Sequence, residues 1–285
     1  QAMEFVNREN DVLILYADVP LLSKETLSNL IKQALKSDLT ILTAQLDNPF
    51  GLGRIIYQNQ KIVAIVEEKD ANDEQKQLQE INSGVMICNA KLLQRWLPSL
   101  KSNNAQGELY LTDVVALAVN EFLIVDKYKT FDPMEIQGIN DLLQLEKVER
   151  EYQVRKVRDL MRKGLTVKDL NRIDIRGRLQ CGHDNIVDVN VVFEGEVTIE
   201  NDVYIAPNCI IRNSTIQNGA IIHENTIIDG SIVGEHAQVG PFARLRPGSE
   251  LGTKSKVGNF VEMKKTKLGD GSKASHLSYI GDAIV

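Results

Sequence analysis

The sequence predicts two structural classes in one chain: an α/β unit, then a left-handed parallel β-helix, with a long helix between them. In the first half, apolar runs of strand length alternate with helical patterns, which indicates an α/β layer architecture. Residues 140–163 carry apolar side chains at mostly helical spacing in a charge-rich stretch. In the second half, an apolar residue returns every five or six residues, which is typical of a hexapeptide β-helix.

The first half can be assigned element by element. Residues 12–16 (VLILY) form a continuous apolar run, which favours a strand buried on both faces of a parallel sheet. Ser23 is a candidate N-cap for a helix that carries apolar residues at helical spacing. We expect further strands at residues 39–46, 53–57, 61–67, 85–88 and 123–128, and further helices at residues 71–79, 91–97 and 109–122.

The charged stretch is a candidate connector between two domains. We expect one long helix there, and Gly164 is placed to end it because many helices finish on a glycine. The expected limits are therefore residues 1–142 for the α/β domain, 143–163 for the linker helix and 164–285 for the β-helix.

The six-residue register of the second half is the most specific pattern in the sequence. Each hexapeptide forms a short strand and a turn, and three of them close a triangular coil with the apolar residue inside. A sandwich strand would show period two instead. The register positions are Ile175, Cys181, Val187, Phe193, Ile199, Ile205, Ile211, Ile216, Ile222, Ile228, Val233, Val239, Leu245, Leu251, Val257, Met263, Leu268, Ala274 and Ile280.

Composition excludes several classes of protein. Of the 285 residues, 43% are hydrophobic and 25% charged, which is ordinary for a protein with a packed core. The net charge of −6 argues against nucleic-acid or anionic-membrane binding, which favour clustered lysine and arginine. No apolar run suits a bilayer span, and no secretory signal opens the sequence. The three cysteines form neither a metal spacing nor a disulfide framework, so we expect a cytoplasmic protein.

Asp18 is a candidate metal ligand. In open α/β sheets, ligands bind beyond the carboxyl ends of the strands, and Asp18 follows an apolar strand and precedes the break at Pro20. A carboxylate so placed suits Mg²⁺, which takes few protein oxygens together with phosphate oxygens. The alternative is an aspartate that caps a helix or a turn.

The β-helix carries a second set of candidates. His276 comes two residues after a register position, so we expect it outside the prism, where it could act as a general base beside Tyr279. Arg246 and Lys264 are one coil of 18 residues apart and should stack on one face, where they could clamp a phosphate. The alternatives are an ordinary surface histidine and a solvated charged face.

Nine segments, taken in order along the chain, resemble one family of bifunctional enzymes. They are LYADVP (15–20), GRI (53–55), IVEEKD (65–70), EINSG (80–84), NNAQGELYLTD (103–113), GIN (138–140), GPFARLRPG (240–248), GNFVEMKK (258–265) and GSKASHLSYIGD (271–282). The family that they resemble is the N-acetylglucosamine-1-phosphate uridylyltransferase/glucosamine-1-phosphate N-acetyltransferase family.

The resemblance implies two reactions that together make UDP-N-acetylglucosamine. The β-helix would transfer acetyl from acetyl-CoA to glucosamine 1-phosphate. An incomplete Rossmann-like nucleotidyltransferase domain would then join the product to UMP from UTP, with release of pyrophosphate. The family is homotrimeric through its β-helix, and its product feeds peptidoglycan and lipopolysaccharide synthesis.

The resemblance also implies roles for particular residues. Asp18 and Asn140 match the Mg²⁺ ligands, and His276 matches the general base of acetyl transfer. The family usually has glycine where Ala17 stands. Contacts to the nucleotide sugar are implied for Tyr16, Ala17, Asp18, Gly53, Glu67, Asn82 and Asn140, and contacts to the amino-sugar phosphate for Arg246, Lys264 and Tyr279.

The resemblance further implies that the chain is a central piece of such an enzyme. The glycine-rich phosphate loop of the family does not precede Asp18, and the sequence stops within a repeat at Val285. We therefore expect this piece alone to perform neither reaction well. Two alternatives stay open: a nucleotidyltransferase whose β-helix is regulatory, and a truncated trimeric scaffold without activity.

Overall fold

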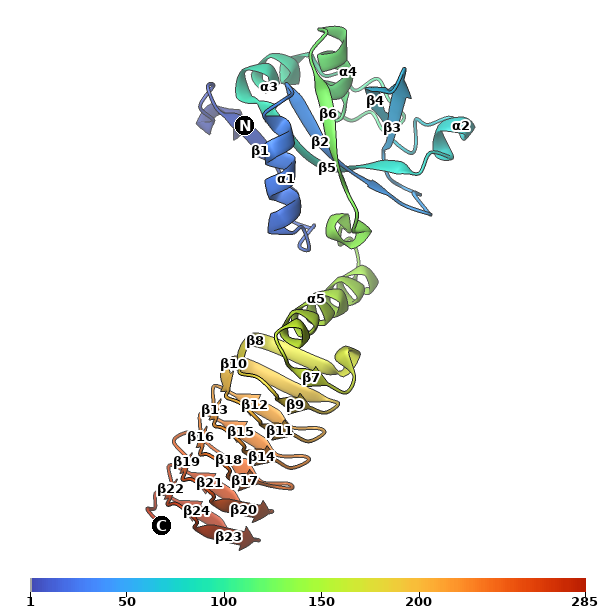
Figure 1. The fold of residues 1–285 in the computed structure, drawn as a ribbon. Coiled ribbons are helices and arrows are strands. Elements are labelled where there is room, and N and C mark those ends of the chain that lie inside the picture. Colours follow the sequence, from blue (N-terminus) through green and yellow to red (C-terminus); the bar gives the residue numbers. More distant parts are fainter. Residues whose placement is uncertain (1) are drawn as a thin grey trace. The chain divides into compact units, whose positions relative to one another are not determined.

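The chain divides into two compact units, residues 1–148 and 149–285, and the computed structural model describes residues 2–285. The boundary falls within helix α5, Leu142–Arg162, which is the long helix expected from the charged stretch (Figure 1). Gly164 follows it with a φ of 106°, a conformation that glycine adopts without steric cost.

The first unit is built on one mixed sheet of order β4-β3-β5-β2-β6, with β1 paired to β5 (Figure 1). Strands β2 and β6 are parallel, and the other pairs are antiparallel. The strands are β1 (Asp11–Ile14), β2 (Leu39–Gln45), β3 (Arg54–Gln58), β4 (Lys61–Val66), β5 (Glu80–Asn89) and β6 (Val125–Thr130).

Strand β1 corrects the expectation for residues 12–16. It is antiparallel to β5 and lies at an edge of the sheet, so it is neither parallel nor fully buried. Its apolar run serves both faces, because Val12 and Ile14 pack into one core cluster and Leu13 into another. The strand ends before Leu15 and Tyr16, which are 48% and 46% exposed.

Helices cover both faces of this sheet. One core cluster joins the sheet to α3 and α4 through Leu93, Trp96 and Val115, and the other joins it to α1 through Leu30. Ser23 caps α1 as expected, because its hydroxyl accepts a hydrogen bond from the Thr26 amide. The helices are η1 (Ala2–Phe5), α1 (Lys24–Ala34), α2 (Asp73–Lys76), α3 (Ala90–Trp96), η2 (Leu97–Ser99), α4 (Asp113–Asn120) and η3 (Pro133–Ile136).

Two of these helices are shorter than the sequence predicts. The capping box at Asn72 starts α2 late, and the helix lasts one turn instead of spanning residues 71–79. Helix α4 begins at Asp113 and not at residue 109, because the preceding residues are used for other contacts: Leu111 packs against the core and Thr112 hydrogen-bonds to Glu67.

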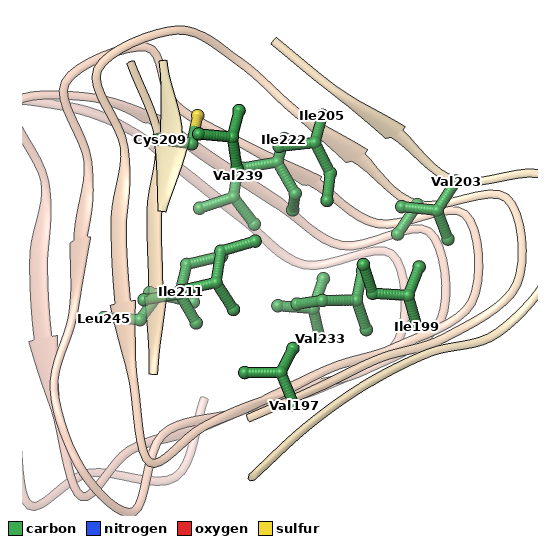
Figure 2. Packing of buried hydrophobic residues seen from close by; sticks show 14 of the residues in the cluster. Val197, Ile199, Val203, Ile205, Cys209, Ile211, Ile222, Val233, Val239 and Leu245 are labelled. Atoms are coloured by element: carbon green, nitrogen blue, oxygen red, sulfur yellow. The ribbon is translucent and has the colours of Figure 1, made fainter. Parts of the chain in front are cut away.

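The second unit is a left-handed parallel β-helix with an aliphatic interior (Figure 2). Every register position from Val187 to Ala274 is buried, as the period of six predicts. Parallel pairing stacks each coil on the next, for example Leu245 on Ile228 and Met263 on Leu245.

Most strands of this unit have two to four residues and stack in parallel from coil to coil, whereas β8 and β10 have nine residues each (Figure 1). The strands are β7 (Thr166–Val167), β8 (Ile173–Cys181), β9 (Ile186–Val187), β10 (Val191–Ile199), β11 (Tyr204–Ile205), β12 (Ile210–Arg212), β13 (Thr215–Ile216), β14 (Ile221–Ile222), β15 (Ile227–Asp229), β16 (Ile232–Val233), β17 (Gln238–Val239), β18 (Arg244–Leu245), β19 (Glu250–Leu251), β20 (Lys256–Asn259), β21 (Glu262–Lys264), β22 (Lys267–Leu268), β23 (Lys273–His276) and β24 (Tyr279–Gly281), with a short 3₁₀ turn, η4 (Leu170–Arg172), before β8.

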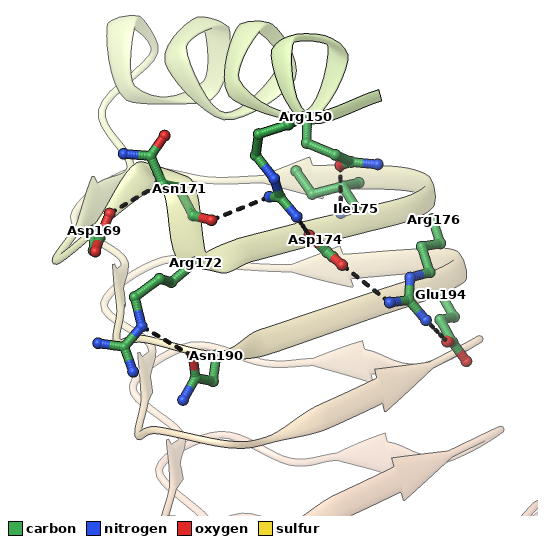
Figure 3. Close-up of polar contacts among 10 residues, drawn as sticks. Arg150, Asp169, Asn171, Arg172, Asp174, Ile175, Arg176, Asn190 and Glu194 are labelled. Atoms are coloured by element: carbon green, nitrogen blue, oxygen red, sulfur yellow. Dashed lines mark hydrogen bonds and ion pairs between the residues drawn. The ribbon is translucent and has the colours of Figure 1, made fainter. Parts of the chain in front are cut away.

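The second half of α5 covers the first coil of the β-helix (Figure 3). Val157 is fully buried in the β-helix core. Gln153 Oε1 accepts a hydrogen bond of 2.8 Å from the Ile175 amide, and Arg150 forms an ion pair of 3.0 Å with Asp174. Because an open coil end would leave apolar side chains and backbone groups without partners, the helix closes the end of the stack.

Across residues 2–285, no helix combines the length and the apolar character that a membrane span requires.

Candidate functional site

A cavity of about 590 Å³ opens in the first unit at the ends of several strands. Its lining brings together residues that lie far apart in the sequence, from the turn after β1, the loop before β3, the start of β5 and the segment after η3. Six of the seven predicted nucleotide-sugar residues line it: Tyr16, Asp18, Gly53, Glu67, Asn82 and Asn140. Ala17 does not line the cavity.

The two candidate metal ligands lie on segments that are joined by a backbone hydrogen bond. The amide of Ile139 donates to the carbonyl oxygen of Asp18 at 3.0 Å, so the turn that carries Asp18 and the segment that carries Asn140 are held together. A Cβ atom at Gly138 would lie 3.5 Å from Asp18 Oδ2, which shows how closely the two segments approach.

Glu67 follows β4 and is fixed from two sides. Thr112 Oγ1 donates a hydrogen bond of 2.9 Å to Glu67 Oε1. On the facing strand end, a Cβ atom at Gly53 would lie 3.1 Å from Glu67 Oε2 and 3.0 Å from Ile65. A side chain at position 53 would therefore push the carboxylate out of place, and glycine leaves the room that it needs.

Tyr16 lies directly on Gly84. A Cβ atom at Gly84 would come within 2.3 Å of the Tyr16 ring, and the φ of 83° at Gly84 also disfavours any other residue. Burial, followed by the negative charges of Glu67 and Asp18, raises the pKa of Tyr16 above 10.0. The cavity therefore combines the negative charges of Asp18 and Glu67 with the aromatic ring of Tyr16.

Asn82 presents an unused acceptor in this cavity. Its side chain is 7% exposed, and its Oδ1 atom has no hydrogen-bond partner among residues 2–285. Buried polar atoms are nearly always paired in folded proteins. Because Asn82 lines the cavity, this oxygen is a candidate acceptor for a hydroxyl or amide N–H group of a ligand.

Sequence reasoning missed two residues of this site. Thr112 holds Glu67, and Gly84 receives Tyr16, yet neither was singled out. Both lie inside segments that carried the family resemblance, NNAQGELYLTD and EINSG. Their contacts join residues 45 and 68 positions apart in the sequence, and only the fold brings such pairs together.

The β-helix candidates lie on neighbouring faces near the last coils. The Arg246 amide bonds to the Met263 carbonyl at 2.8 Å, which puts Arg246 in register with Lys264 as the spacing predicts. Tyr279 pairs with Glu262 on β21. Glu262 also forms an ion pair with Arg246, in which Arg246 Nη1 lies 3.0 Å from Glu262 Oε1. His276 belongs to β23 in the adjacent sheet and is exposed, so it lies outside the prism as expected.

Lys264 interrupts an alternation of charge along one column of the prism. Successive coils stack Arg176, Glu194, Arg212 and Asp229, and continuing this register brings Arg246 and then Lys264. The first members form ion pairs, some of which Figure 3 shows. Two cations in succession repel each other, so this end of the column favours an anion.

One corner of the prism changes in character at the same coils. Asn190, Asn208 and Asn225 occupy it with φ near 60°, and their amides form a hydrogen-bonded ladder. The next coils place Phe242, Phe260 and Leu277 there with φ of 53°, 56° and 51°. The two phenyl rings stack at 5.3 Å and are 50% and 56% exposed. Bulky residues are rare in this conformation, and here they form an exposed apolar column.

Comparison with known proteins identifies relatives of both units. A family profile described as the GMPPB C-terminal domain matches residues 175–285. The chain is 49% identical over 284 residues to the bifunctional protein GlmU of Marinobacter nauticus and 50% identical over 275 residues to that of Pseudomonas putida strain KT2440. It is homologous to the bifunctional GlmU proteins.

The match covers 99% and 96% of this chain but 63% and 60% of those two GlmU proteins. The chain therefore spans less than two thirds of the length of the relatives that it matches. Among solved structures, that of PerB from Caulobacter crescentus in complex with CoA and GDP-perosamine is similar over 54% of this chain and 83% of its own, with 18% identity and a TM-score of 0.33.

Proposed function

We propose that this protein takes part in the synthesis of UDP-N-acetylglucosamine through two activities, uridylyl transfer in the first unit and acetyl transfer in the β-helix. The observation that carries the proposal is the identity of about 50% with curated bifunctional GlmU proteins over nearly the whole chain. Residues 1–142 form the uridylyltransferase domain, residues 143–163 the linker helix and residues 164–285 the acetyltransferase domain.

The cavity of the first unit suits the proposed uridylyl transfer. N-acetylglucosamine 1-phosphate offers hydroxyl and amide donors, which match the free Oδ1 of Asn82 and the carboxylate of Glu67. Tyr16 forms the aromatic wall beside the sugar nucleotide, and Gly53 leaves space for close approach of the backbone. These groups bind and orient the sugar phosphate so that its oxygen faces the nucleotide phosphorus.

Asp18 and Asn140 would hold Mg²⁺ at this cavity. Their carboxylate and amide oxygens are hard donors, and the carboxylate of Glu67 in the same cavity lining also favours a cation. No three His, Cys, Asp or Glu side chains in residues 2–285 form a metal-binding group, so phosphate oxygens would complete the coordination. The metal supplies charge neutralisation on the transferring phosphoryl group and on pyrophosphate.

The proposed acetyl transfer uses the exposed residues of the last coils. Arg246 and Lys264 bind the phosphate of glucosamine 1-phosphate, and Tyr279 lies beside them. His276 accepts a proton from the amine as the nitrogen attacks the thioester carbon of acetyl-CoA. The sulfur then leaves as the thiol of CoA, and the acetyl group forms an amide with the sugar nitrogen.

We also propose that the protein forms a homotrimer through its β-helix. The exposed column of Phe242, Phe260 and Leu277 supports this proposal, because stacked rings on the surface give an apolar contact to a second copy. The column begins at the coils that carry Arg246 and Lys264, so self-association would occur beside the proposed acetyl site.

Two assays on the purified protein, in the form that its gene encodes, test the proposed function. With UTP, N-acetylglucosamine 1-phosphate and Mg²⁺, we expect UDP-N-acetylglucosamine and pyrophosphate by mass spectrometry. With acetyl-CoA and glucosamine 1-phosphate, we expect N-acetylglucosamine 1-phosphate and free CoA. Uridylyl transfer without acetyl transfer would favour a regulatory β-helix, and failure of both assays would favour a scaffold.

A further inference from the structure

A buried ion pair lies directly behind the cavity of the first unit. Arg54 is 1% exposed, and its Nη2 atom lies 2.7 Å from Glu68 Oε2, with side-chain exposures of 2% and 17%. Neither side chain lines the cavity. Each follows a residue that does line it, because Arg54 comes after Gly53 and Glu68 comes after Glu67.

The guanidinium of Arg54 joins three segments of this wall, and the backbone of the preceding residue joins a fourth. Besides Glu68, it donates to the carbonyl of Leu52, which lines the cavity, and to the carbonyl of Lys76 at the end of α2, at 3.4 Å. The carbonyl of the preceding Gly53 accepts a hydrogen bond of 2.8 Å from the amide of Asn82. The Arg54 side chain therefore ties the loop before β3 to the end of β4 and to α2, and the adjacent Gly53 carbonyl ties the same strand end to the start of β5.

Stability alone does not account for this arrangement. Removing two charges from water costs several kcal/mol, and apolar residues of similar volume often replace a buried pair without loss. Arg54 Nε, moreover, has no hydrogen-bond partner among residues 2–285, which adds to the cost. What the pair supplies is geometry, because the planar guanidinium bonds several acceptors in fixed directions, which a lysine cannot reproduce.

We propose that Arg54 and Glu68 are positioning residues that hold Gly53 and Glu67 in place for the sugar phosphate. The inference rests on the proposed uridylyl transfer in this cavity. Glu67 and Gly53 face each other across the open end of the β3–β4 hairpin, and a Cβ at Gly53 would already touch the carboxylate at 3.1 Å. A small slip of either strand end therefore displaces the carboxylate from the sugar.

The test compares four variants in steady-state uridylyl transfer and thermal unfolding. Arg54→Met leaves Glu68 buried without its partner, so both the Tm and sugar-phosphate binding should fall. The double variant Arg54→Met/Glu68→Leu removes both charges, which should recover most of the Tm but not the binding. Arg54→Lys keeps the positive charge but loses the planar guanidinium with its several donors. Lys91→Met, which removes an exposed ion pair with Glu9, is the matched control.

We expect the double variant and Arg54→Lys to raise the KM for N-acetylglucosamine 1-phosphate about tenfold, which is about 1.4 kcal/mol, with a smaller change for UTP. Lys91→Met should match the wild type. A double variant with wild-type Tm and wild-type KM would overturn the proposal, and so would loss of Tm without a change in KM. The wild-type reaction in the same series tests the proposed function separately, because its absence would count against uridylyl transfer itself.

Discussion

Lys264 is unfavourable for folding at its position, since Arg246 stands next to it in a column that otherwise alternates in charge. Arg246 has Glu262 as a partner at 3.0 Å, whereas Lys264 adds a second positive charge beside this pair. A site that binds a ligand can require residues that are unfavourable for stability. The single residue therefore carries information that the repeat pattern does not.

We predict that Lys264→Gln keeps or slightly raises the Tm while the KM for glucosamine 1-phosphate rises about tenfold or more. The substitution removes one half of the proposed phosphate clamp and also the repulsion with Arg246. Differential scanning calorimetry and a CoA-release assay measure the two effects. Lys168→Gln, an exposed position near the first coil, is the matched control. Lower Tm with unchanged KM would show that Lys264 is only structural.

At this scale, the sequence predicts residues whose chemistry is local and misses those whose role depends on a distant contact. Asp18 could be found because it follows an apolar strand, and the cavity lining includes it. Arg54 could not, because its role depends on Glu68, 14 residues away on a neighbouring strand end, and on the carbonyl of Lys76. The sequence places Arg54 on a strand, but a charged residue on a strand gives no sign that its side chain is buried.

At the scale of elements, the period of a pattern decided how well each could be predicted. The six-residue register located the buried positions of the β-helix, because each hexapeptide contributes one inward side chain regardless of its neighbours. The apolar run at residues 12–16 predicted a strand correctly but not how that strand pairs. Such a run fits a central strand, and it fits equally well an edge strand whose two faces pack into different core clusters, as β1 does.

The apolar corner column provides a prediction about assembly. Phe242→Asn/Phe260→Asn extends the asparagine ladder of the preceding coils, and asparagine tolerates the left-handed backbone better than phenylalanine. We therefore expect a folded protein with wild-type or higher Tm that no longer trimerises. Analytical ultracentrifugation measures the mass. Asn208→Ala, in the same corner but outside the apolar column, should leave assembly intact. A trimer of the double variant would contradict the proposal.

The cap of the β-helix provides a prediction about acid. Burial acts to raise the pKa of Asp174, but hydrogen bonds and charges from Arg176 and Arg150 outweigh it and lower the pKa below 3.8 (Figure 3). A carboxyl with a depressed folded pKa stabilises the fold above its unfolded pKa, and this contribution is lost as the pH falls through the folded pKa.

Asp174→Asn should therefore lower the urea midpoint of the β-helix near neutral pH, and the difference from the wild type should shrink below pH 3.8. The cap contact between α5 and the first coil is the part affected, because Arg150 loses its partner on β8. Asp159→Asn, which removes an exposed ion pair within α5, is the control and should show little difference at any pH. A pH-independent difference for Asp174→Asn would contradict the assigned cause.

At the scale of the whole molecule, the two units have separate cores and separate candidate sites. The α/β unit has its own clusters around the sheet, and the β-helix has a continuous core that includes Val157 of α5. The long helix contributes residues to both units, because the boundary between them falls after Val148. Each site is built from residues of one unit alone.

This separation predicts that the two proposed activities can be removed one at a time. Asp18→Asn takes away the carboxylate that would hold Mg²⁺, so uridylyl transfer should fall about a hundredfold or more while acetyl transfer stays at the wild-type rate. His276→Ala should have the opposite effect, because the amine then lacks a general base. Both reactions are measured on both variants, and the Tm of each variant shows whether it is folded. A variant that keeps its Tm but loses both activities would mean that the sites are not independent, and the assignment of one reaction to each unit would fail.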